Sequence, residues 1–85
     1  LQNQFTFYPN PVTANAKLSG EFSAVKTINI CLYNTTGICI KSWVFASQQS
    51  GTQEFSLNLS ELPPGIYFLR LQAGNEVAVK KVVKL

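Results

Sequence analysis

The stretch Phe55-Ser56-Leu57-Asn58-Leu59-Ser60 decides the fold class, because large apolar residues alternate in it with small polar ones. In an extended strand successive side chains point to opposite faces, so this pattern buries one row and leaves the other in water. The same period of two recurs at residues 28–33 and 66–71, where Arg70 marks the outer side. No segment carries a sustained stripe of apolar residues at helical spacing. The chain is therefore predicted to be all-β.

Turn-forming residues divide the chain into short runs. The prolines of Tyr8-Pro9-Asn10-Pro11 cannot donate backbone hydrogen bonds, so this segment ends a short first strand. Asn34-Thr35-Thr36-Gly37 predicts a hairpin with glycine in the left-handed conformation, and Ala73-Gly74-Asn75-Glu76 predicts a second hairpin. A polar loop is expected at residues 48–52 and a rigid corner at Leu62-Pro63-Pro64-Gly65.

These turns separate six or seven predicted strands, at residues 4–8, 16–22, 26–33, 38–46, 53–59, 65–73 and 76–84. Such a series in 85 residues, with no crossover helices, predicts a small antiparallel immunoglobulin-like β-sandwich. The Cys…Trp…Cys spacing of antibody domains is absent, so the likeness is one of architecture. We expect one domain over residues 1–85. The chain opens on Leu1 without an initiator methionine, so we expect it to be excised from a longer precursor.

The net charge of +3 is concentrated at the end of the chain. Lys80, Lys81 and Lys84 fall within the last six residues, and without them four basic groups remain against four acidic ones. A nucleic-acid-binding domain would be expected to spread basic residues along a face, interleaved with aromatic ones. Nucleic acid is therefore not an expected partner. The apolar runs are far shorter than the roughly 18 residues that span a bilayer, so no membrane span is expected.

The composition argues against an enzyme. The sequence contains no His and no Asp, and only two Cys. Without His there is no Ser–His or Cys–His nucleophile pair, and two Cys alone cannot complete a structural zinc site. The four glutamates are scattered and show no spacing typical of a paired-acid site. We therefore expect a non-catalytic domain with no metal and no cofactor.

Cys31 and Cys39 flank the first predicted hairpin. They are expected to lie on one face of adjacent strands, as diagonal neighbours rather than directly opposed. A disulfide needs Cα atoms within roughly 7 Å of each other, so the spacing allows a bridge without implying one, and two unpaired thiols are the favoured interpretation. Export from the cell would favour the bridge.

Four aromatic residues offer the best case for ligand binding. Trp43, Phe45, Tyr33 and Tyr8 could form a platform for sugar rings. In so small a sandwich, however, aromatic side chains more often fill the core.

The last predicted strand alternates regularly up to Lys80, but the run Lys81-Val82-Val83 breaks the pattern. A β-bulge near Lys80 and Lys81 would restore it, and the pattern leaves the register of this strand open. Lysines on an edge strand block unwanted pairing with other sheets. They also present a charged end to a partner, and the sequence leaves both interpretations open.

Motifs follow one another in a fixed order along the chain. They are Tyr8-Pro9-Asn10-Pro11, then Ile30-Cys31-Leu32-Tyr33-Asn34 with Gly37 and Ile40, then Leu57-Asn58-Leu59-Ser60-Glu61-Leu62-Pro63 running into Gly65-Ile66-Tyr67-Phe68-Leu69-Arg70-Leu71, and finally Lys80-Lys81-Val82-Val83-Lys84. Over nearly its whole length the chain resembles the type A C-terminal sorting domain of the type IX (Por) secretion system of Gram-negative bacteria. The two Cys beside the hairpin depart from the family's pattern, so the resemblance implies no disulfide.

The resemblance implies a secretion signal rather than a catalyst. A cargo protein would lie N-terminal to the domain and cross the inner membrane by the general secretory route. The folded domain would then be recognised in the periplasm by the outer-membrane translocon. A sortase-like cysteine peptidase would remove it upstream of Tyr8 and attach the cargo to surface lipopolysaccharide or release it. The expected location is the periplasm in transit, then the cell surface or the extracellular space.

Two groups of residues are expected to matter for this role. Lys80, Lys81, Val82, Val83 and Lys84 are expected to contact the secretion machinery. The fold is expected to depend on the motif residues Tyr8, Pro9, Asn10, Pro11, Gly37, Leu62, Gly65 and Tyr67. The alternative is an accessory carbohydrate-binding or adhesive sandwich of a secreted enzyme, and a third interpretation is a structural sandwich that buttresses a catalytic neighbour.

Overall fold

The computed structural model describes residues 5–22, 26–48 and 51–85, in which every element is a strand. The strands are β1 (Phe5–Tyr8), β2 (Asn15–Phe22), β3 (Lys26–Tyr33), β4 (Cys39–Gln48), β5 (Gly51–Asn58), β6 (Gly65–Ala73) and β7 (Glu76–Lys84). The predicted all-β class and the seven predicted strands are confirmed. Their ends shift by three residues or fewer, as expected where backbone pairing rather than side-chain pattern decides the boundary.

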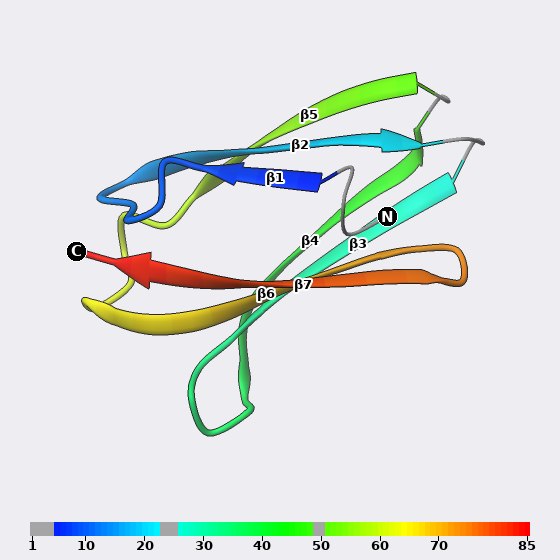
Figure 1. The fold of residues 1–85 in the computed structure, drawn as a ribbon. Helices are drawn as coiled ribbons and strands as arrows, with labels where there is room; N and C mark the ends of the chain where they lie inside the picture. Colours follow the sequence, from blue (N-terminus) through cyan, green and yellow to red (C-terminus); the bar gives the residue numbers. More distant parts are fainter. Residues whose placement is uncertain (1–4, 23–25, 49–50) are drawn as a thin grey trace.

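The strands form two sheets that pack face to face (Figure 1). One sheet has the order β1-β2-β5 and the other the order β4-β3-β6-β7, and neighbouring strands in both run antiparallel. The chain passes to the other sheet after β2, after β4 and after β5. This arrangement is an immunoglobulin-like β-sandwich, as predicted.

The core lies between the sheets and is filled by the rows of side chains that the period of two predicts. On β3, Ile28 and Ile30 are 0% exposed, and on β6 so is Leu69. From the other sheet, Leu18 of β2 and Leu57 of β5 are buried against them. Burying one such side chain contributes about 1.5–3 kcal/mol. The alternation in the sequence therefore supplies the main driving force for this fold.

Two hairpins form where the turn residues predict them. The side-chain Oδ1 of Asn34 accepts hydrogen bonds from the backbone N–H groups of Thr36 and Ile38, both at 3.0 Å. Gly37 has a φ of 86°, a backbone conformation that residues other than glycine rarely adopt. Between β6 and β7, Ala73 pairs with Glu76, which leaves a loop of two residues. Both predicted hairpins are confirmed.

The structure settles the register of the last strand, which contains no bulge at Lys80 and Lys81. The register between β6 and β7 runs without a shift from the Gly65–Lys84 pair to the Ala73–Glu76 pair. Lys80 and Lys84 therefore take positions on the same side of the sheet as buried Ala78. A lysine can occupy such a position at a sheet edge because its long methylene stem covers apolar surface.

Candidate functional site

The proline-flanked corner after β1 lies directly against the end of β7, and Figure 1 places both at the same end of the sandwich. The side-chain Nδ2 of Asn10 donates to the backbone oxygen of Lys81 at 2.8 Å. The backbone N–H of Val83 donates to Oδ1 of Asn10 at 3.0 Å. One carboxamide thus binds the backbone of β7 on both sides of Val82.

Val12 continues the same pattern with its own backbone. Its N–H donates to the oxygen of Val83 at 2.8 Å, and its oxygen accepts from the N–H of Leu85 at 2.9 Å. These bonds form a parallel bridge between Val12 and Lys84. The Asn10 carboxamide makes the equivalent pair of bonds two residues earlier, so residues 10–12 act as a short parallel strand. We call residues 10–12 the clamp.

The clamp holds the last residues of an edge strand. Within the described residues β7 pairs with β6 on one side only, so its other side would otherwise present unpaired N–H and C=O groups. The Tyr8–Pro9 and Asn10–Pro11 peptide bonds are both cis. Val12 is 0% exposed and belongs to the core cluster, so the clamp is itself anchored. The first and last motifs of the sequence therefore form one structural unit.

The third motif joins the same unit through Tyr67. Its hydroxyl donates to the backbone oxygen of Pro63 at 2.6 Å, which ties the rigid corner to β6. Leu62 packs against the core at this corner, and Gly65 opens β6 opposite Lys84. Tyr67 pairs with Val82, the residue that the Asn10 carboxamide brackets.

The structure separates the residues that the sequence grouped as a basic end. Lys81 is exposed on the outer face of its sheet, meaning the face that points away from the other sheet. Lys80 is half-buried on the inner side. Lys84 is only 6% exposed, and its Nζ donates to the oxygen of Leu85 at 3.1 Å. Val82 is buried and Val83 is half-buried. Among the three lysines of this segment, Lys81 therefore offers the most accessible charge.

Cys31 and Cys39 are free thiols on the outer face of the four-stranded sheet. Cys39 pairs with Tyr33, and Cys31 pairs with Ser42, which makes the two thiols diagonal neighbours as predicted. Desolvation raises the pKa of Cys39, and a hydrogen bond to Cys31 raises it further. The charge of Cys31 and a hydrogen bond to it raise the pKa of Tyr33.

The four aromatic residues considered for sugar binding do not form a platform. Trp43 and Phe45 pack against the core, where Phe45 stacks on Phe55 with 4.4 Å between ring centroids. Tyr33 lies on the outer face of the four-stranded sheet, whereas Tyr8 lies on the outer face of the three-stranded sheet. The sequence suggested a shared surface because it cannot show to which sheet each strand belongs.

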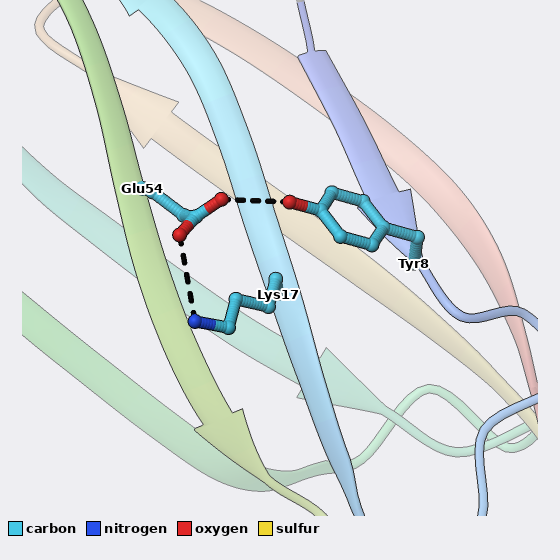
Figure 2. Close-up of polar contacts among 3 residues, drawn as sticks. All are labelled: Tyr8, Lys17 and Glu54. Atoms are coloured by element: carbon cyan, nitrogen blue, oxygen red, sulfur yellow. Dashed lines mark hydrogen bonds and ion pairs between the residues drawn. The ribbon is translucent and has the colours of Figure 1, made fainter.

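A polar cluster that the sequence did not indicate joins the three strands of the smaller sheet (Figure 2). The hydroxyl of Tyr8 donates to Oε2 of Glu54 at 2.7 Å, and Nζ of Lys17 lies 3.4 Å from Oε1 of the same carboxylate. The hydrogen bond from Tyr8, helped by the charge of Lys17, lowers the pKa of Glu54. The same hydrogen bond raises the pKa of Tyr8. The cluster links edge strand β1 to β5 across β2.

Over residues 5–22, 26–48 and 51–85, no three His, Cys, Asp or Glu side chains gather in a way that could hold a metal ion. In the same residues there is no helix of the length and apolarity that crossing a membrane requires.

A family model described as a secretion system C-terminal sorting domain matches residues 6–85. The match begins within β1 and ends at the last residue, so it includes the clamp and the whole of β7. No curated protein matches the chain.

Proposed function

Because the chain belongs to the family of secretion system C-terminal sorting domains, we propose that it directs a cargo protein across the outer membrane through the type IX secretion machinery. The family is one of sorting signals and not of catalysts. A cargo joined to the N-terminal side of the domain would be carried to the cell surface or the extracellular space.

The proposal extends to the route. The folded domain is recognised in the periplasm by the outer-membrane translocon, and a sortase-like peptidase then cuts upstream of Tyr8. A cut that precedes β1 would leave all seven strands together. The domain could therefore stay folded while it is separated from its cargo.

One observation supports the C-terminal strand as the recognition element. The clamp holds the backbone of β7 from Lys81 to Leu85 through four hydrogen bonds of 2.8–3.0 Å. A partner would thus meet an ordered strand end, and would lose little conformational entropy in binding it. We assign the contact to residues 80–84, with Lys81 as the exposed charge and buried Lys84 and Val82 holding the strand in place.

The test is to fuse residues 1–85 to a periplasmic reporter in a host that has the type IX system. The reporter is expected at the cell surface with the domain attached, and in the periplasm when the domain is omitted or the translocon is deleted. A fusion that stays in the periplasm of the intact host would refute the proposed function.

Truncation after Val79 is a poorer test. It removes the second half of β7 together with every backbone group that the clamp binds. If the truncated domain still reaches the surface, the assignment to residues 80–84 is wrong. Loss of export would also follow from unfolding, so single substitutions with an unchanged melting temperature are the decisive variants.

A further inference from the structure

Residues 5–22, 26–48 and 51–85 cover only part of the β7 edge. Lys81, Val83 and Leu85 direct backbone groups away from β6 and toward the clamp. Because strand geometry repeats every two residues, Val77 and Val79 direct their N–H and C=O groups to the same side. In the described part of the chain no strand pairs with that side of β7, and the clamp reaches back only to Lys81. We call the backbone of Val77 and Val79 on this side the open edge.

The side chains beside the open edge are apolar. On the outer face, Val77 is 39% exposed and Val79 is 50% exposed. On neighbouring β6, Ile66 is 42% exposed and Phe68 is 38% exposed. Exposed apolar side chains scattered singly need no explanation, but here four of them share one face of two adjacent strands.

The charges on this face have one sign. Arg70 pairs with Val79, and Lys81 pairs with Phe68, so two cations lie among the apolar side chains. The acidic residues lie elsewhere: Glu21 on β2, Glu54 on β5, Glu61 between β5 and β6, and Glu76 at the inner side of the start of β7. A second copy of the chain would bring like charges together at this edge. A strand with acidic side chains would instead place negative charges beside Arg70 and Lys81.

The other edge strands are protected in ways that β7 is not. β1 has four residues, and short edges resist pairing. The pairing of β4 with β3 shifts register twice, which twists an edge away from a neighbour. The side chains of β5 that point away from the core are polar or charged, at Thr52, Glu54, Ser56 and Asn58. The open edge keeps a regular register and carries valines.

We propose that the open edge binds an extended segment of a partner protein by strand addition, and that this segment presents both apolar and acidic side chains on the outer face. Its backbone would pair with Val77, Val79 and the N–H of Lys81, and its acidic side chains would face Arg70 and Lys81. Main-chain bonds give such complexes affinity, and alternate side chains give specificity. The identity of the partner as a component of the secretion machinery rests on the proposed function.

The first experiment measures amide hydrogen exchange by NMR on the whole 85-residue chain. The probes are a short synthetic peptide in which valine pairs alternate with glutamate pairs, so that each face of the strand carries both residues, and a matched peptide with lysine in place of glutamate. The glutamate peptide is expected to slow amide exchange at Val77, Val79 and Lys81. Exchange at Ala78 and Lys80, whose N–H groups face β6, is expected to change little. The glutamate peptide should bind at least about tenfold more tightly than the lysine peptide, because like charges across an interface repel.

Equal binding of the two peptides, or protection that does not alternate along β7, would overturn the proposal. Protection that appears without peptide and grows with protein concentration would also overturn it, since the occupant would then be a second copy.

The second experiment uses substitutions in the reporter fusion. Val79→Pro removes an N–H on the open side and leaves the bonds to β6 in place, and Val79→Glu adds a charge that repels an acidic segment if the proline variant does not fold. The matched control is Val44→Glu, at a valine that is 65% exposed on edge strand β4. We expect surface reporter to fall at least about tenfold for the Val79 variants, at an unchanged melting temperature, and to stay at the wild-type level for the control.

Wild-type export by a folded Val79 variant would overturn strand addition and leave the sorting function standing. A wild-type fusion that is not exported would instead count against the sorting function.

Discussion

Asn10 and Val83 lie 73 positions apart in the sequence, yet the side chain of the first accepts a hydrogen bond of 3.0 Å from the backbone of the second. The same carboxamide donates to Lys81, so it takes the place of a strand residue beside β7. As an edge strand, β7 must keep its end ordered without a full neighbouring strand. The clamp meets this requirement with one side chain and one backbone bridge.

The first prediction concerns this carboxamide. Asn10→Ala should lower the free energy of unfolding by about 1–2 kcal/mol, because two hydrogen bonds to the β7 backbone are lost. Asn10→Asp should cost at least as much, since a carboxylate accepts from Val83 but repels the oxygen of Lys81. Urea unfolding measures the free energy of unfolding of both variants. The control is Asn29→Ala, at an exposed asparagine on the outer face of β3, and equal effects of Asn29→Ala and Asn10→Ala would show that the clamp contributes nothing specific.

The second prediction separates two lysines of the same strand. Lys84→Ala should destabilise the domain by about 1.5–2.5 kcal/mol, because it exposes core surface that the buried methylene stem covers. Lys84→Met should restore most of this loss, since it keeps the apolar stem. Lys81→Ala, at an exposed position, should stay within about 0.5 kcal/mol of wild type. Similar losses for Lys84→Ala and Lys81→Ala would contradict the different burial of the two side chains.

The third prediction is a pH dependence. The pKa of Glu54 is lowered in the folded chain, so its contribution to stability is present above the ordinary pKa of glutamate and is lost as the pH falls through the lowered value. The pKa of Tyr8 is raised, so its contribution is present below the ordinary pKa of tyrosine and is lost as the pH rises through the raised value. The melting temperatures of wild type and Tyr8→Phe should therefore differ near neutral pH. They should converge in acid and again in strong alkali, and a constant difference over the whole range would rule out this account.

The fourth prediction concerns the thiols. Because Cys31 and Cys39 are diagonal neighbours on the same face of adjacent strands, oxidised glutathione should join them. Two thiol hydrogens would be lost as one glutathione disulfide is reduced to two thiols. A closed loop of this length is expected to add about 2–3 kcal/mol of stability. The intact mass shows whether the bridge has formed, and unfolding with and without reductant measures the gain in stability. Cys39→Ser is the control. A monomer whose mass and stability are the same in both buffers would exclude the bridge.

The sequence predicted the parts of the structure that depend on local pattern. Alternation located the strands, and turn chemistry at Asn34 and Gly74 located the hairpins. The register of β7 stayed open because two lysines occupy inner positions, and hydropathy treats a lysine as wholly polar although its stem is not.

The contacts that build the site were beyond the reach of local pattern. The motif containing Asn10 was recognised, but its partners Lys81 and Val83 lie more than 70 positions away. Glu54 gave no signal at all, because its link to Tyr8 exists only through the pairing of both β1 and β5 with β2. Such contacts follow from sheet order, which the alternation of a single strand does not encode.

The central claim is that the secretion machinery recognises the ordered end of β7 through Lys81. Surface reporter per cell, measured for the Lys81→Ala fusion beside wild type, tests it most directly. The charge-matched control is Lys17→Ala, on the other sheet. At melting temperatures equal to wild type, we predict that Lys81→Ala lowers surface reporter about tenfold and that Lys17→Ala leaves it unchanged. Wild-type export of the Lys81→Ala fusion would contradict the claim.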